Sequence, residues 1–487
     1  MQKKTYITSA IPYVNAKPHI GHALEFVQTD TIARWHKAFL KEQVVTLSGG
    51  DENALKNVQA AEKEGVPIQE FVDTNNALFE KLAAKLNAPY TIWQKGSDQV
   101  HHYPSSQQLW MRCAANINEI GESDIYEKSY EGLYCVGCET FYTREELNEQ
   151  GECFEHPGKK LEKVKEKNYF FRLSRYQKRI IDVIRGKDKE YSLTIIPEKR
   201  KHEVLSFLER GLIDISISRS NERAKNWGVP VPGDTTQRIY VWFDALNIYQ
   251  SGIGFGWDEK KYFEHWPADV QVIGKGIIRF HAVYWPAFLL SAKLKLPKKI
   301  FVHEYFTVNG QKMSKTLGNV IDPIQLIDKY GADSLRYYFL AKISPFSDGD
   351  FSEKEFIRTY NADLANGLGN LVARVAKLCE SSNLSIGQSD HYQFHPIVTQ
   401  YMATYQFNCA LESIWERIKG KDKQMDMQKP WEDTDKKHHI LVDLVEGIRE
   451  IAHDLQPFLP QTSQIILNQF KGPHISMLPP LFQRIVQ

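Results

Sequence analysis

Two lysines in one short loop suggest a site for a polyphosphate. Residues 309–319 read NGQKMSKTLGN, so Lys312 and Lys315 lie three residues apart in a segment rich in Gly and Asn. Ammonium groups placed where negative charge develops stabilise departing pyrophosphate more than the bound ground state. A loop can also close over a nucleotide and open to release product. The alternative interpretation is a solvated basic turn.

Two histidines near the N-terminus form a second candidate site. The stretch PHIGH at 18–22 places His19 and His22 three residues apart, where a loop enters a predicted helix. A helix N-terminus offers free N–H groups and the positive end of the helix dipole. Gly21 would let a base or a phosphate approach the backbone closely. The alternative is a pair of histidines that only caps the helix.

The third candidate site is a metal centre made of Cys135, Cys138, Cys153 and His156. Each pair has a two-residue spacer, which lets both side chains reach one metal ion across a tight turn. Three sulfurs and one imidazole make a closed tetrahedral set, so the spacing predicts one structural Zn²⁺ per chain. The alternative, an unliganded or disulfide-bonded set, is disfavoured in a reducing compartment.

The elements that must position these side chains follow a parallel α/β pattern. A helix is predicted from Ile20 to about Phe39, and strands are predicted at 5–10, 44–48, 270–274 and 299–306. Strand, loop, helix and strand in this order indicate a Rossmann-type, doubly wound parallel sheet, which binds ligands beyond the carboxyl ends of its strands. The simplest interpretation of VWFDAL at 241–246 is the end of a core strand, and we accept this interpretation for Phe243.

The sheet is predicted to be split by an inserted domain and followed by an α-helical bundle. The middle of the chain has short strands, charged turns and the Cys/His set, whereas after about residue 353 apolar residues recur at helical spacing. The predicted ranges are 1–115 for the first half of the catalytic domain, 116–225 for the inserted zinc-knuckle domain, 226–320 for the second half, 321–352 for a connecting region and 353–487 for the bundle.

Composition excludes several classes of protein. The chain has 487 residues and a formal net charge of +1, so an anionic partner must be met by local basic patches. We find no run of eighteen apolar residues, and the N-terminus lacks the apolar stretch and cleavage site of a signal peptide. We therefore expect a cytoplasmic protein with no membrane partner.

Together, these motifs resemble a known family. HIGH at 19–22 and KMSKT at 312–316 are similar to the two signature motifs of class I aminoacyl-tRNA synthetases. Further stretches resemble the methionyl-tRNA synthetases: ITSAIPYVNAKPHIGHA (7–23), LYCVGCE (133–139), KNYFFRLSRYQ (167–177), YVWFDAL (240–246), RFHAVYWPAFL (279–289) and NADLANGLGNL (361–371). The resemblance runs from about residue 5 through at least residue 460.

The resemblance assigns roles to individual residues. It implies that His19, His22, Lys312 and Lys315 are catalytic, and that they bind ATP together with Gly21 and Gly274. Asp51 would bind the methionine ammonium group. Trp242 would pack against the thioether, because sulfur makes favourable contacts with aromatic rings. The full methionine pocket falls on Ala10, Ile11, Tyr13, Asp51, Trp242, Ala245, Leu246, Tyr249, Ile277 and His281.

The resemblance also implies the reaction and the partners. The methionine carboxylate would attack ATP, which carries Mg²⁺, to give methionyl-adenylate and pyrophosphate; the 3′-terminal adenosine of tRNA(Met), initiator or elongator, would then accept methionine. In the bundle, Trp431 would stack on an anticodon base, with Asn370 and Arg374 as further contacts. The alternative for these last two is a satisfied helix-interface pair. Because the chain ends after the bundle, we expect a monomer.

Several positions depart from the family pattern. Gly276 stands where the family has an Asp that helps hold the ribose, and Asn53 stands where it has a His. Glu304 follows His303 where Gly is common, and Thr316 replaces Ser at the end of the lysine motif. The stretch between ISISR and WGVPVP is longer than usual. Because the motif histidines and lysines remain, we expect an active enzyme.

Other functions stay open at this point. A smaller nucleotidyltransferase also uses an H-x-G-H loop, but it needs neither a zinc insertion nor an anticodon-like bundle. A tRNA-binding relative that has lost activity is compatible with Gly276. A class I synthetase for another aliphatic amino acid would usually carry a larger insertion.

Overall fold

The computed structural model describes residues 3–135, 140–142, 144, 147–153, 158–311, 313, 318–388, 392–432 and 436–486. The chain divides into two compact units. The first unit holds residues 1–18, 43–81 and 90–303, and the second holds residues 19–42, 82–89 and 304–487.

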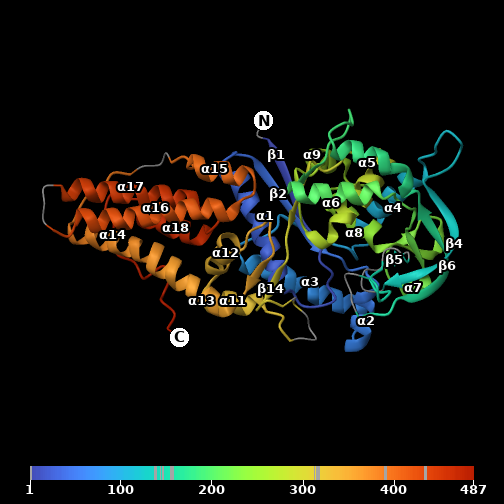
Figure 1. Ribbon diagram of the computed structural model, residues 1–487, viewed down its shortest axis with the longest axis horizontal. Helices are drawn as coiled ribbons and strands as arrows, with labels where there is room; N and C mark the ends of the chain where they lie inside the picture. Colours follow the sequence, from blue (N-terminus) through green and yellow to red (C-terminus); the bar gives the residue numbers. More distant parts are fainter. Residues whose placement is uncertain are drawn as a thin grey trace. The chain divides into compact units, whose positions relative to one another are not determined.

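A six-stranded parallel sheet forms the centre of the first unit (Figure 1). Its strands, in spatial order, are β3 (Ile92–Lys95), β2 (Gln43–Gly50), β1 (Lys4–Ser9), β12 (Val270–Gly274), β13 (Lys299–His303) and β7 (Thr194–Ile196). β1 and β12 are buried along almost their whole length, as expected for strands covered on both faces. The strand order reverses between β1 and β12, which is where such sheets bind ligands. The predicted doubly wound parallel sheet is confirmed.

Helices cover this sheet and supply much of the core. Among them α8 is buried along its whole length and packs against α4. The expectation of a strand end at 241–246 was wrong, because Val241 starts α8; Phe243 is nevertheless fully buried. The helices of this part are α2 (Leu55–Glu64), α3 (Ile68–Lys85), α4 (His102–Ala114), α8 (Val241–Ser251), α9 (Glu259–His265) and α10 (Trp285–Ser291).

Two antiparallel sheets lie between the halves of the parallel sheet in sequence. The first has the order β5 (Thr140–Tyr142), β4 (Ile125–Cys135), β6 (Glu162–Phe171) and β8 (Ile215–Ser216), and the second has the order β10 (Pro230–Val231), β11 (Asp234–Ile239) and β9 (Ser218–Ser220). The helices here are α5 (Gln177–Ile184), α6 (Glu198–Glu209) and α7 (Asn221–Ala224). β7 lies inside the predicted insertion 116–225 yet pairs with β13, so the chain returns to the parallel sheet before residue 225.

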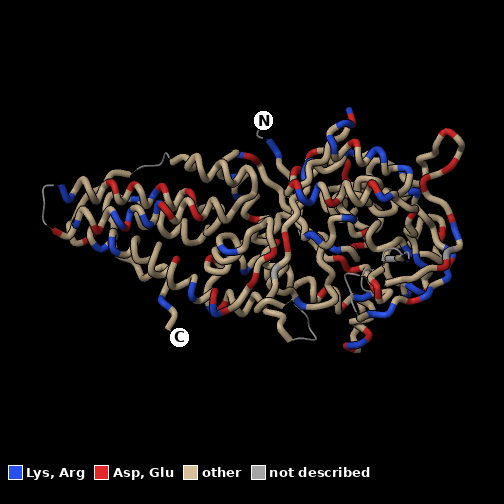
Figure 2. Tube along the Cα trace, in the orientation of Figure 1, with Lys and Arg blue, Asp and Glu red and all other residues tan. Residues whose placement is uncertain are grey.

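The second unit is mainly helical. Its helices are α1 (Ile20–Ala38), α11 (Pro323–Tyr330), α12 (Ala332–Ala341), α13 (Glu353–Thr359), α14 (Asn370–Ser381), α15 (Pro396–Ala403), α16 (Phe407–Gln428), α17 (Lys437–Leu455) and α18 (Pro460–Gln469), with a π-helical stretch at Tyr360–Gly369. Figure 2 shows basic and acidic residues interspersed along α16 and α17. The predicted helical character after residue 353 is confirmed.

A small parallel sheet precedes the bundle in sequence. β14 (Phe306–Val308) pairs with β15 (Gly349–Phe351), so the strand predicted at 299–306 ends at His303 and the chain joins another sheet.

A buried arginine connects helices of the second unit. The fully buried Arg336 of α12 contacts Asp30 of α1 at 2.7 Å and donates Nε–H to the carbonyl of Phe458 at 2.8 Å. Within the described ranges, no helix is long and apolar enough to cross a membrane.

Candidate active site

The residues predicted for the methionine pocket come together in the first unit. Tyr13 follows β1, Asp51 follows β2 and His281 follows β12, and these three strands are neighbours in the sheet. The chain just after β1 contributes Ala10 and Ile11, the short 3-10 helix after β12 contributes Ile277, and α8 contributes Trp242, Ala245, Leu246 and Tyr249. Tyr13 forms an isolated β-bridge with Asp51. Its ring meets the Trp242 ring edge-on, with ring centroids 6.1 Å apart.

The loop that carries Asp51 is held by hydrogen bonds to its backbone and its neighbour. The Asp51 N–H donates to the Pro12 carbonyl at 2.9 Å, and its own carbonyl accepts from the Asn57 amide at 2.8 Å. Glu52 is fully buried, and its carboxylate accepts from Ser97 N–H at 2.9 Å and Oγ–H at 2.6 Å. Burial raises the pKa of Glu52, against the effect of these bonds. A loop fixed in this way keeps the Asp51 carboxylate in one place.

Tyr249 and His281 form a neutral polar pair at the pocket. His281 Nδ1 lies 3.0 Å from the Ile277 carbonyl, which can only accept, so the ring proton is on Nδ1. Nε2 therefore accepts from the Tyr249 hydroxyl at 2.8 Å. Burial lowers the pKa of His281 to about 4, so the imidazole is neutral near pH 7. The pair offers polar contacts without a charge, which suits a thioether.

Phe280 lies against a predicted methionine-pocket residue, although the sequence analysis did not include it among the candidates. Its ring stacks on Trp242 with centroids 3.6 Å apart and planes 4° apart. The indole Nε1–H of Trp242 has no hydrogen-bond acceptor among the described residues. An aromatic residue directly before His281, in RFHAVYW, was the available signal. The two rings form a flat apolar wall of the kind that packs well against sulfur.

The two motif histidines lie in the second unit and cap α1. His19 Nδ1 accepts from the Gly21 N–H at 3.0 Å, and His22 Nδ1 accepts from the His19 N–H at 3.1 Å. The rings stack with centroids 3.9 Å apart. Burial, and then the neighbouring His19, lowers the pKa of His22 well below its usual value. Because both Nδ1 atoms accept, each neutral ring carries its proton on Nε2, the atom suited to donate to a phosphate.

Gly21 is required by the histidine that precedes it. A Cβ atom at this position would lie 2.8 Å from Cε1 and 3.0 Å from Nδ1 of the His19 ring. A side chain would therefore push His19 out of its capping position. The helix-cap interpretation and the phosphate interpretation are thus compatible, since capping uses only one nitrogen of each ring.

Lys312 and Lys315 lie outside the described residues, but the segments beside them do not. The Cε of Met313 lies 3.5 Å from the position of a Cβ on Gly21. Further along the chain, after both lysines, the Ile321 carbonyl accepts from the Ile20 N–H at 3.2 Å. Met313, between the two lysine positions in sequence, and Ile321, after them, therefore lie near the first residues of α1.

Half of the predicted zinc set is described. The Sγ atoms of Cys135 and Cys153 are buried and 3.4 Å apart, too far for a disulfide. Two thiolates on one tetrahedral zinc would lie about 3.8 Å apart, so the two cysteines fit a shared metal. Cys138 and His156 lie outside the described residues, and the residues that the structure describes hold no cluster of three metal-ligating side chains.

The predicted anticodon residues differ in their surroundings. Trp431 follows α16 and is 48% exposed. Asn370, at the start of α14, is also exposed. Arg374 contacts Asp422 at 2.8 Å and Asp426 at 2.7 Å. This is the helix-interface arrangement that was the alternative for Arg374.

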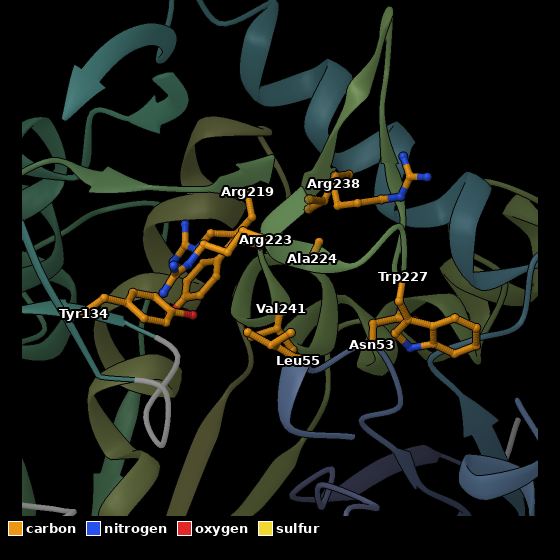
Figure 3. Close-up of a pocket in the computed structure, with 11 residues that line it drawn as sticks. Asn53, Leu55, Tyr134, Arg219, Arg223, Ala224, Trp227, Arg238 and Val241 are labelled. Carbon is orange, nitrogen blue, oxygen red and sulfur yellow. The ribbon is translucent and has the colours of Figure 1, made fainter. Parts of the chain in front are cut away.

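A small pocket lies beside the Asp51 loop (Figure 3). It has a volume of about 30 Å³, which is room for about two water molecules. Asn53 and Trp227 lie next to one another at one side, and Arg219 and Arg223 lie with Tyr134 at the other. Among the lining residues that the structure describes, none is acidic. The pocket is too small for methionine or a nucleotide.

The fold and these sites define a class I aminoacyl-tRNA synthetase. The family model described as tRNA synthetases class I (M) matches residues 5–376. The chain is 37% identical to the methionine–tRNA ligase of Brucella melitensis biotype 1, over 97% of this chain and 92% of that protein. It is 37% identical to the methionine–tRNA ligase of Thermotoga maritima, over 96% of this chain and 75% of that protein.

A solved structure agrees with these relatives. Mycobacterium tuberculosis methionyl-tRNA synthetase in complex with methionyl-adenylate superposes with a TM-score of 0.89 at 33% identity, over 99% of this chain and 100% of that chain. The chain belongs to the methionyl-tRNA synthetase family.

Proposed function

We propose that this chain activates methionine with ATP and transfers it to tRNA(Met). The observation that carries the proposal is the convergence of Asp51 and the stacked Trp242 and Phe280 near the carboxyl ends of β1, β2 and β12. Asp51 takes the ammonium group, and the rings hold the thioether beside the neutral pair of Tyr249 and His281. A mostly apolar pocket with few polar anchors suits methionine.

Activation needs positioning rather than a protein nucleophile. The methionine carboxylate attacks the α-phosphate of ATP, and pyrophosphate leaves. His19 and His22 donate from Nε2 to the phosphates, and Lys312 and Lys315 stabilise the leaving group. The nearness of Met313 to Gly21 and the hydrogen bond of Ile321 to Ile20 support this assignment, because these residues lie within and just after the lysine motif. Gly21 and Gly274 complete the ATP contacts, and Mg²⁺ arrives with the phosphates of ATP.

The second step transfers methionine from the adenylate to tRNA bound to the same chain. The 3′-terminal adenosine hydroxyl attacks the activated carbonyl and releases AMP. The exposed Trp431 stacks on an anticodon base of initiator or elongator tRNA(Met), with Asn370 beside it. Arg374 could contact the anticodon only if its side chain released the carboxylates of Asp422 and Asp426. The proposal keeps the predicted domain ranges, which are 1–115, 116–225, 226–320, 321–352 and 353–487. It also includes a monomeric state and a location in the cytoplasm.

One structural zinc completes the proposal. Cys135, Cys138, Cys153 and His156 would hold it, and the 3.4 Å between the two described sulfurs supports a shared ion. Bound zinc would crosslink the turn after β4 to the segment before β6. The proposed reaction has no step at this metal.

The experiment that tests the proposal is ATP–pyrophosphate exchange, run separately with each of the twenty amino acids. We expect exchange with methionine alone. Exchange with another aliphatic amino acid would reassign the pocket. If no amino acid supports exchange while tRNA still binds, the chain is a tRNA-binding relative whose activity was lost at positions such as Gly276.

A further inference from the structure

Asn53 links two elements of the methionine pocket that are far apart in sequence. Its side-chain Nδ2 lies 2.6 Å from Oδ2 of Asp244 and 2.7 Å from the Gly96 carbonyl. Both partners can only accept, so the amide nitrogen donates one hydrogen to each. The hydroxyl of Tyr103 faces the amide oxygen at 3.4 Å, which agrees with this orientation.

Asp244 is the centre of a buried polar cluster on α8. It is 1% exposed, and its Oδ1 lies 2.7 Å from His102 Nε2 and 2.8 Å from Ser106 Oγ. His102 in turn contacts Ser251 at the end of α8 at 2.8 Å. A buried carboxylate is tolerated only when donors surround it. Asn53 supplies the donor for the second oxygen.

The cluster joins the two sides of the pocket. Asn53 lies two residues after Asp51, and Asp244 lies two residues after Trp242. Their hydrogen bond therefore sets the Asp51 loop against the first turn of α8. Trp227 holds the loop from another side, because its indole N–H donates to the Glu52 carbonyl at 2.8 Å, and Figure 3 shows it next to Asn53.

We propose that Asn53 is a positioning residue for methionine, which fixes the distance between the carboxylate of Asp51 and the ring of Trp242 through its bond to Asp244. The inference rests on the proposed function. Asparagine suits this role, because its neutral amide places two hydrogens on one nitrogen between a carbonyl and a carboxylate. A neutral histidine ring has a single N–H, so position 53 works differently here from a chain with His in its place.

The first test is Asn53→Ala, studied by methionine binding in calorimetry and by ATP–pyrophosphate exchange. We expect the Kd and KM for methionine to rise roughly tenfold, because a charge-assisted hydrogen bond is lost at a site that needs fixed geometry. The KM for ATP should change by less than about twofold. Asn116→Ala is the matched control, since Asn116 bonds Asp124 at 2.8 Å in a similarly part-buried setting; it should leave both KM values unchanged.

A second variant keeps the proposal testable if Asn53→Ala does not fold. Asn53→Asp places a carboxylic acid against Asp244, and such a pair holds a proton at low pH and loses it as pH rises. The other titratable or charged groups nearby are Glu52 on the same loop, His102 and Tyr103 on α4, and Arg238 on β11. The KM for methionine, relative to the native chain at each pH, should therefore increase from about pH 5 to pH 8.

The outcomes separate the two proposals. A native chain that neither binds methionine nor supports exchange overturns the proposed function, and this inference with it. A native chain that is active, with an unchanged methionine KM in Asn53→Ala or a pH-independent ratio in Asn53→Asp, overturns only the role of Asn53. An equal rise of both KM values, accompanied by lower stability, would mean a general structural role and would also overturn it.

Discussion

The backbone N–H of Ile20 donates to the carbonyl of Ile321 across 3.2 Å. These residues are far apart in sequence, yet the bond joins the start of α1 to the segment after Lys312 and Lys315. Met313 lies between the two lysine positions in sequence, and its Cε is 3.5 Å from where a Cβ on Gly21 would stand. The structure thus brings residues from within and just after the lysine motif near the histidine motif, whereas the sequence could only place two motifs in order.

Replacing Lys315 should impair the first chemical step. We expect Lys315→Ala to lower the rate of ATP–pyrophosphate exchange by about 100-fold or more, because a cation that meets developing charge acts mainly in the transition state. Methionine binding, measured by calorimetry, should survive. Lys354→Ala, at an exposed lysine of α13, is the control and should exchange normally. An unchanged exchange rate would remove Lys315 from the mechanism.

Replacing Trp431 should impair only the reaction with tRNA. Loss of stacking on one base costs about 1–3 kcal/mol, so we expect Trp431→Ala to reduce kcat/KM for tRNA by roughly 10- to 100-fold. ATP–pyrophosphate exchange without tRNA should not change. The control is Phe263→Ala, an exposed aromatic of the first unit. If exchange and aminoacylation fell together, the anticodon role would be wrong.

The buried His281 should make stability depend on pH. Burial lowers its pKa from 6.5 to about 4, so between these values the unfolded chain binds a proton that the folded chain does not. Stability therefore rises with pH across this window, and protonation of the unfolded state removes up to about 3 kcal/mol as pH falls from 7 to 4.

The measurement is denaturant unfolding of the native chain and of His281→Gln between pH 4 and pH 7. The stability difference between the two proteins should shift by up to about 3 kcal/mol, with the native chain losing more at low pH. His474→Gln, at an exposed histidine, serves as the matched control. A difference that stays constant over the whole range contradicts the assignment.

Metal analysis should find about one zinc per chain if the four ligands bind as a structural site. Cys135→Ser and Cys153→Ser should each lose the metal and unfold at a lower temperature. Cys113→Ser changes another buried cysteine and should keep the zinc. A folded native chain that contains no metal would reject the site.

Local patterns in the sequence predicted the parts of the molecule that depend on neighbouring residues. Alternating and continuous apolar runs located β1, β12 and α1 within a residue or two, and the spacing of His19 and His22 placed them at a helix start. These features depend on hydrogen bonds and burial within a few residues, so the sequence determines them directly. The motif order, in turn, determined the family.

Only the tertiary structure decided which distant residues meet. Asn53 contacts Asp244 across 191 positions, and Phe280 covers Trp242. The edge strand β7 belongs to the parallel sheet although it lies within the predicted insertion. Such contacts follow from the packing of whole elements, and no periodicity in a short window records which element will be the neighbour. For the same reason, VWFDAL looked like a strand end until its apolar residues were seen buried on all sides of α8.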